Sequence, residues 1–176
     1  TTRTAEQTSI ALFWAHDRIS MGTPMRMYNR ILRNVANDQE NDLSENARLF
    51  AMASTAVADA GIVAWDAKFK YDFWRPVTGI RDAGNDGNPD THPDPSWVPL
   101  GAPGGTLSDG TVITDFTPPF PTYVSGHATF GGALFGTLEE FYGTDDISFE
   151  VTSDEMPGMV RSYDSFSDAM AENGRS

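Results

Sequence analysis

The stretch "NDLSENARLFAMASTAVADAGIVAWDAKFKYDFW", from Asn41 to Trp74, decides the fold class. Its middle, residues 47–67, is rich in alanine, the strongest helix former, and is nearly all small or apolar. Ser44 is the expected N-cap, and no capping box is expected because Ala47 is the third residue after it. A helix that is apolar all round is expected to be enclosed by neighbours. Gly61 is expected to permit one close contact within it.

Other segments repeat apolar residues at the three- and four-residue spacing of an amphipathic helix. They cover residues 5–19, 24–38 and 125–143 and a final stretch that begins near Pro157. No stretch shows sustained alternation of apolar and polar residues, so the sequence predicts an all-α helical bundle. The residues carrying the spacing are Ile10, Phe13, Trp14 and Asp17; Met27, Ile31 and Val35, after Pro24 in a first turn; Ala128, Leu134, Leu138 and Phe141; and Val160, Tyr163, Phe166 and Met170.

Residues 76–122 have a different character, dominated by Pro, Gly, Asp, Asn and Thr. Such a long irregular connection in a compact domain is usually functional or mobile. We therefore expect one helical domain over residues 1–176, part of a larger domain, with a long loop between core helices. Within the loop, Asp86, Asn88 and Asp90 alternate like calcium ligands. No glutamate follows in register, so a solvated turn is the favoured interpretation.

Composition excludes several classes of protein. The net charge is −13 and the sequence pI is near 4.4, which argues against nucleic acid and anionic membranes as partners. No apolar run approaches the roughly 18 residues that cross a bilayer. The absence of cysteine excludes disulfides, thiolate zinc sites and cysteine nucleophiles. No targeting peptide is visible in the first residues.

Lys68 and Lys70 are the only lysines, and Arg75 follows Lys68 by seven residues. Seven residues are about two helical turns, so Lys68 and Arg75 would share one face about 10 Å apart. Both side chains are long enough to converge, whereas Lys70 should point to water. The alternative is structural: Lys68 pairs with Asp72 at i, i+4, and Arg75 caps carbonyls at the helix end.

A second polar group, Ser125-Gly126-His127, stands where a proline-stiffened loop gives way to a helix. Ser125 suits the N-cap, Gly126 lets an anion approach free N–H groups, and His127 can exchange a proton near neutral pH. A surface N-cap is the structural alternative. Together with Lys68 and Arg75, these groups would suit a tetrahedral oxyanion such as phosphate or vanadate.

Two motifs resemble a known family. "KFKYDFWRP" fits Lys-x6-Arg-Pro and "PTYVSGHATFGG" fits Ser-Gly-His, the first two motifs of the vanadium-dependent haloperoxidases and the related type 2 phosphatidic acid phosphatases. The flanking sequence is similar to the chloroperoxidases of this family, over most of the chain and most weakly in residues 1–22 and 143–158. Val124 departs from the pattern, because a proline usually precedes the serine.

The resemblance implies a role for each matching position. His127 would be the acid–base histidine, and Asp17 would support the site through a second arginine. A phenylalanine at position 120 favours chloroperoxidase character. The resemblance places Lys68, Arg75, Ser125 and the Gly126 N–H on the equatorial oxygens of vanadate, and Trp65 and Phe120 on the halide side.

The third motif of the family, Ser-Arg-x5-His-x3-Asp, supplies an oxyanion-binding arginine and the histidine that bonds to vanadium. Ser176 fits its first residue, so we expect the arginine and the ligand histidine beyond Ser176. Residues 1–176 alone are therefore expected to be incomplete for catalysis. His16 and His92 do not match the missing position and are interpreted as ordinary polar residues.

The implied function is a vanadate-dependent haloperoxidase that oxidises halide with hydrogen peroxide to hypohalous acid, which then halogenates a small organic substrate. An acid phosphatase of the same superfamily is an alternative that uses the same pocket. A non-catalytic helical module is a second alternative, supported by Val124 and the missing motif. Association with the remainder of its own domain and a homodimer both stay open. Relatives are often exported, so a secreted or periplasmic location is expected.

Overall fold

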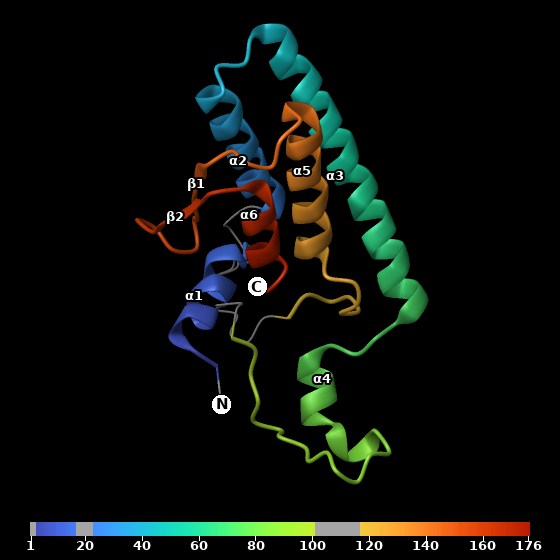
Figure 1. The fold of residues 1–176 in the computed structure, drawn as a ribbon. Helices are drawn as coiled ribbons and strands as arrows, with labels where there is room; N and C mark the ends of the chain where they lie inside the picture. The colour runs from blue at the N-terminus through green and yellow to red at the C-terminus, as the bar shows by residue number, and fades with distance from the viewer. Residues whose placement is uncertain (1–2, 17–22, 101–116) are drawn as a thin grey trace, which may run out of the picture.

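The computed structural model describes residues 3–16, 23–100 and 117–176, and their secondary structure is almost entirely helical (Figure 1). This confirms the predicted all-α helical bundle. The elements in chain order are α1 (Ala5–Trp14), α2 (Pro24–Asp38), α3 (Leu43–Tyr71), α4 (Pro76–Arg81), a 3₁₀ turn (Ala83–Asn85), α5 (Gly126–Tyr142), β1 (Phe149–Thr152), β2 (Val160–Tyr163) and α6 (Phe166–Asn173).

Helix α5 is the centre of the bundle. It packs against α3 on one side and against α6 and α2 on the other, and it runs antiparallel to α3 (Figure 1). Leu134, Phe135 and Leu138 of α5 are at most 2% exposed and form the middle of the core. A Cβ on Gly61 of α3 would lie 3.0 Å from the Phe130 ring, which confirms that this glycine permits a close helix contact.

Helix α2 has the predicted bounds, with Pro24 in its first turn. The predicted stripe of Met27, Ile31 and Val35 is buried. Tyr28 and Leu32 are buried beside it, so α2 presents a wider face to the core than the sequence indicated.

Helix α1 is shorter than the predicted 5–19. It ends at Trp14, and His16 has a φ of 34°, in the left-handed region that does not continue a helix. Phe13 and Trp14 are buried as the spacing indicated. Asp17, the last residue of that spacing, lies outside the described residues.

The N-terminus of α3 corrects the predicted cap. Asp42, not Ser44, is the N-cap, and its side chain accepts a hydrogen bond from the Glu45 N–H at 2.8 Å. The Glu45 side chain accepts from the Asp42 N–H in return, so a capping box is present. At the other end Asp72 has a φ of 49° and terminates the helix three residues before Arg75.

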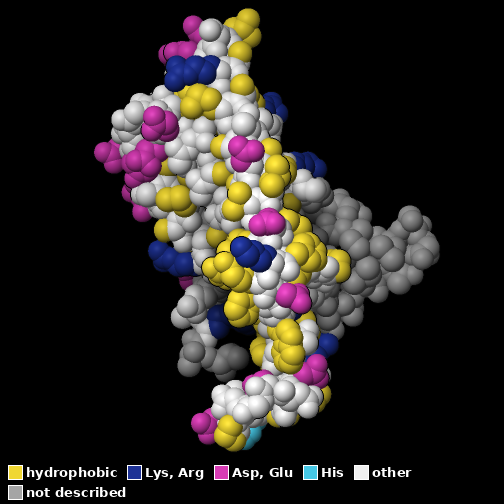
Figure 2. Space-filling model, turned by 90° about the vertical axis from the view of Figure 1, so that its right-hand side faces the viewer, with side chains coloured by type: hydrophobic (Ala, Val, Ile, Leu, Met, Phe, Trp, Pro, Cys, Tyr) yellow, Lys and Arg dark blue, Asp and Glu magenta, His cyan; other side chains and the backbone are white. Residues whose placement is uncertain are grey.

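The expectation that α3 is enclosed is wrong for the described part of the chain. Its buried residues there are Leu49, Ala53, Ala64 and Lys68, because α5 covers one face. Ile62 and Val63 are 70% and 63% exposed, and Figure 2 shows hydrophobic side chains gathered along this face. By length and composition alone, 43–81 could cross a membrane, contrary to the sequence expectation. This is weak evidence, since core helices of soluble proteins pass the same test.

The final predicted helix is also corrected. Val160 and Tyr163 belong to a two-stranded antiparallel sheet, in which Phe149 pairs with Tyr163 and Thr152 with Val160. Gly158, with a φ of 87°, lies in the turn between the strands. Helix α6 begins only at Phe166, after the Ser165 hydroxyl caps it by accepting from the Asp168 N–H.

A partly buried ion cluster joins α1, β2 and α6. Its members, here called the Arg161 cluster, are Glu6, Trp14, Arg161, Tyr163 and Glu172. The Glu172 carboxylate accepts from Arg161 Nη2 at 2.8 Å, from the Tyr163 hydroxyl at 2.7 Å and from Trp14 Nε1 at 3.0 Å. Arg161 also pairs with Glu6. These contacts hold the hairpin and α1 against the end of α6.

Candidate functional site

A cavity of about 540 Å³ lies at the N-terminal end of α5. It is bounded by the end of α3, the start of α4, the loop before α5 and the end of the chain at Ser176. Every predicted site residue within the described part of the chain lines this cavity: Trp65, Lys68, Arg75, Phe120, Ser125, Gly126 and His127.

The two predicted cations meet although a break in the helix separates them. Asp72 ends α3, and Arg75 is the N-cap of α4. This short helix lies within the segment that was predicted to be irregular. The Lys68 amine lies 5.0 Å and the Arg75 guanidinium carbon 4.6 Å from the centre of the Phe120 ring. Both charges therefore approach one ring from separate elements.

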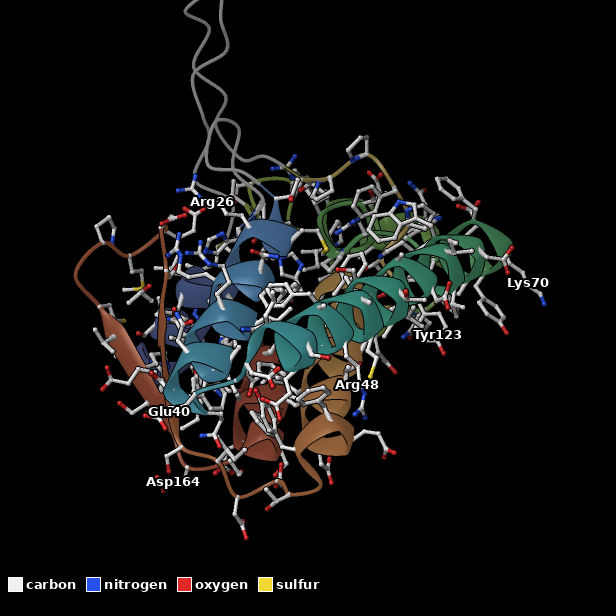
Figure 3. All side chains as sticks on the ribbon, turned by 90° about the horizontal axis from the view of Figure 1, so that it is seen from above. Arg26, Glu40, Arg48, Lys70, Tyr123 and Asp164 are labelled. Atoms are coloured by element: carbon white, nitrogen blue, oxygen red, sulfur yellow. The ribbon has the colours of Figure 1, made fainter. Side chains whose placement is uncertain are left out.

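Hydrogen bonds fix the loop that precedes α5. Lys68 is 2% exposed, and its amine donates to the carbonyls of Pro121 at 3.0 Å and Thr122 at 3.1 Å. Arg75 Nε donates to the Phe120 carbonyl at 2.6 Å. These contacts differ from the structural alternative, in which Lys68 pairs with Asp72 and Arg75 caps carbonyls at the helix end, because the carbonyls bound here belong to the loop before α5. Lys70 is exposed and projects away from the bundle at the end of α3, as predicted (Figure 3).

Aromatic rings form one wall of the cavity. The Trp65 ring centre lies 5.0 Å from that of Phe120 and 5.8 Å from that of Phe130. A Cβ on Gly126 would stand 3.2 Å from the Trp65 ring, so glycine there also allows tight packing of the indole. The cations thus lie beside an apolar, polarisable surface, where cation–π attraction adds to their hydrogen bonds.

The first turn of α5 presents polar groups to the cavity. Ser125 is the N-cap, and its hydroxyl accepts from the Ala128 N–H at 3.3 Å. His127 follows in the first turn, and its Nε2 is buried without a hydrogen-bond partner among the described residues. A buried polar atom without a partner costs free energy, and this one is in a cavity wall where a ligand could supply the missing bond.

Two further polar residues behind His127 were not found from the sequence. The Tyr28 hydroxyl of α2 donates to the His127 carbonyl at 3.0 Å, and Asn173 Nδ2 of α6 donates to that hydroxyl at 3.3 Å. The only available signal was weak: Asn173 follows Phe166 by seven residues, which puts a polar side chain on the apolar face of α6.

An adjoining cavity of about 310 Å³ shares Arg75, Ser125 and His127 with the first. His16, predicted to be an ordinary polar residue, lines neither of the two cavities. It is fully buried, and Ser153 Oγ lies 3.3 Å from its Nε2. Burial lowers the pKa of His16, which favours its neutral imidazole.

Two other candidate groups, His92 and the turn at Asp86 and Asn88, do not line the cavity. His92 is exposed in the loop, and Asp17 is outside the described residues. Asp86 and Asn88 side chains accept main-chain N–H groups two residues ahead, as in a self-contained turn. No cluster of three or more His, Cys, Asp or Glu that could hold a metal ion occurs within residues 3–16, 23–100 and 117–176.

The donor set determines what the cavity can hold. It combines an ammonium, a guanidinium, a hydroxyl, an imidazole and main-chain N–H groups at a helix start. Such groups recognise anions with several oxygens, and a helix N-terminus adds a favourable dipole. The residues present therefore fit a tetrahedral oxyanion of the size of phosphate or vanadate.

Comparison with known proteins agrees with this chemistry. Residues 48–176 match the family described as the VCPO second helical-bundle domain. The chain is 42% identical over 182 residues to the vanadium chloroperoxidase of Curvularia inaequalis. The aligned region covers 92% of this chain and 29% of that protein. The crystal structure of a bacterial vanadium-dependent iodoperoxidase matches with a TM-score of 0.75 and 31% identity, over 96% of this chain and 36% of that one.

Proposed function

Because the chain belongs to the family of the VCPO second helical-bundle domain, we propose that its full-length protein is a vanadate-dependent haloperoxidase. The proposed reaction oxidises halide with hydrogen peroxide to hypohalous acid. The chain spans about a third of the length of the relatives it matches, so the proposal concerns the whole protein. The supporting observation is that Lys68, Arg75 and His127 line one cavity together.

Each residue has a role that follows from its chemistry. Lys68 and Arg75 would bind oxygens of vanadate and compensate their negative charge, with Ser125 and the Gly126 N–H as further donors. His127 would give or take a proton at Nε2, the atom that has no partner among the described residues. Bound vanadate supplies the centre at which peroxide is activated toward halide. Its ligand histidine is proposed to lie beyond Ser176.

The aromatic wall suits the halide. Trp65 and Phe120 present apolar ring surface beside the two cations, so an anion of low hydration would be attracted by charge without competing water. Phe120 is in contact with both cations and is the residue through which halide preference would be tuned.

Halogenation of a dimedone-type substrate by the full-length protein tests the proposal. Activity with peroxide and halide is expected to require added orthovanadate. Lys68→Met should reduce it at least a hundredfold, because the buried ammonium is lost while the stem volume is kept. Lys70→Met is the matched control, since this exposed lysine is two residues away.

Two outcomes would overturn the proposal. Absence of halogenation with chloride, bromide and iodide at saturating vanadate would reject a haloperoxidase. Hydrolysis of phosphate esters that vanadate inhibits, without halogenation, would instead assign the acid phosphatase alternative. Equal activities of the Lys68→Met and Lys70→Met variants would show that Lys68 has no role in the proposed reaction.

A further inference from the structure

We propose that Tyr28 and Asn173 are positioning residues that set the place of His127 in the cavity. The inference rests on the proposed function of that cavity. Neither residue belongs to the two sequence motifs, and they come from α2 and α6, far from His127 in sequence.

The direction of each hydrogen bond follows from proton counting. A tyrosine hydroxyl has one proton, and the 3.0 Å contact to the His127 carbonyl uses it, because a carbonyl can only accept. The same hydroxyl must therefore accept from Asn173, which places the Nδ2 donor 3.3 Å away and turns Oδ1 in the opposite direction. The chain of donors runs from α6 through α2 to the first turn of α5.

Gly131 leaves the space that the Asn173 amide occupies, and Asn173 Oδ1 is buried there without a hydrogen-bond partner among the described residues. A Cβ on Gly131 of α5 would lie 2.1 Å from Asn173 Oδ1, so any other residue at position 131 would displace the amide. Tyr28 and Asn173 are 3% and 1% exposed, so their polar atoms have little access to water. Burying them in an apolar core costs free energy, which a phenylalanine at position 28 would avoid.

Asn173 also reaches the other side of the cavity. Its carbonyl accepts from the Ser176 hydroxyl at 2.6 Å and from the Ser176 N–H at 3.3 Å, and Ser176 lines the cavity together with His127. One residue at the end of α6 thus connects the main chain at Ser176 with the helix turn that carries His127. A displacement of α6 would move both walls together.

Tyr28→Phe in the full-length protein tests the inference, because it removes only the hydroxyl. Tyr142→Phe is the matched control: it removes a hydroxyl that binds Asn41 Oδ1 at 3.2 Å, at the opposite end of α5. Orthovanadate affinity is measured by calorimetry, and kcat and KM for peroxide by halogenation. For Tyr28→Phe we expect a Kd raised about threefold and a kcat lowered about five- to tenfold, with KM within about twofold.

Asn173→Ala is the second variant, and the double variant completes a cycle. If the two residues act as one chain, the double variant should lose no more kcat than the stronger single variant. Tyr28→Phe values within twofold of those of Tyr142→Phe, in both Kd and kcat, would overturn the inference. If the wild type binds orthovanadate but does not halogenate, the proposed function fails and the Kd comparison alone decides the positioning role.

Discussion

The Arg161 cluster and the cavity at the start of α5 both bury polar groups, but they satisfy them differently. In the Arg161 cluster, Glu172 receives three donors, and Arg161 pairs with two carboxylates. In the cavity, Lys68 and Arg75 donate to main-chain carbonyls, and His127 Nε2 has no partner among the described residues. The first arrangement is complete within the fold, whereas the second keeps donors beside an open volume.

The two regions therefore have different roles: the Arg161 cluster stabilises the folded state, and the cavity is suited to bind a ligand. Hydrogen bonds from Tyr163, Arg161 and Trp14 outweigh the effect of burial on Glu172 and leave its pKa below the ordinary value. The charge of Glu172 therefore stabilises the folded state at neutral pH. The groups of the cavity are held by the loop and the helix start, and a ligand would give His127 Nε2 the hydrogen bond that it lacks among the described residues.

Replacing His127 should have the largest effect on activity and little effect on stability, which would distinguish the cavity from the Arg161 cluster. His127→Ala is expected to lower halogenation by the full-length protein at least a hundredfold, because the group that handles the proton is lost. Thermal unfolding should shift by no more than about 2 °C, since no hydrogen bond of Nε2 to a described residue is removed. Activity assays and calorimetric melting measure the two effects.

His92→Ala is the matched control for this variant, because His92 is exposed in the loop. It should leave both activity and melting unchanged. A large loss of stability in His127→Ala would contradict the contrast between the two regions, since it would show that the cavity also supports the fold.

Glu172→Ala should have the reverse pattern, with a loss of stability of about 3 kcal/mol. The variant leaves the Arg161 charge, 16% exposed, without its better buried partner, and the hydroxyl of Tyr163 loses its acceptor. Urea unfolding at pH 7 measures the change. Glu6→Ala is the matched control, because Glu6 pairs with the same arginine but its side chain is 63% exposed, so the expected loss is below about 1 kcal/mol. Equal losses of stability in the two variants would show that the buried contacts of Glu172 contribute no more than the exposed Glu6–Arg161 pair.

The sequence predicted those features of the fold and the cavity that depend on a local pattern of residues. The apolar stripe and the proline gave the bounds of α2, and Ser125 marked the start of α5. The two motifs and the sequence flanking them identified seven residues that line one cavity, although their roles stay predictions. The strands were missed because four residues are too few for alternation to outweigh a helical spacing.

Long-range contacts could not be predicted from one sequence. Tyr28 and Asn173 meet across 145 positions, and no local pattern joins a tyrosine of α2 to an asparagine of α6. The partners of Lys68 were missed for the same reason, since the carbonyls it binds are more than 50 positions away. The exposed face of α3 was also missed, because its composition does not indicate which faces neighbours cover.

The smallest expected effect is the pH dependence of stability, which tests how much the charge of Glu172 contributes to the folded state. Its pKa is lowered in the folded state, so its contribution is fully present above the unfolded value of about 4.3 and is lost as the pH falls through the folded pKa. Glu172→Gln should therefore be less stable than wild type by about 1 kcal/mol at pH 7, and the gap should narrow as the pH falls below the unfolded value of about 4.3. Urea unfolding of both proteins between pH 3 and 7 measures it, with Glu140→Gln on the exposed surface of α5 as control. A gap that stays constant over this range would show that the Glu172 charge adds nothing beyond its shape and its neutral hydrogen bonds.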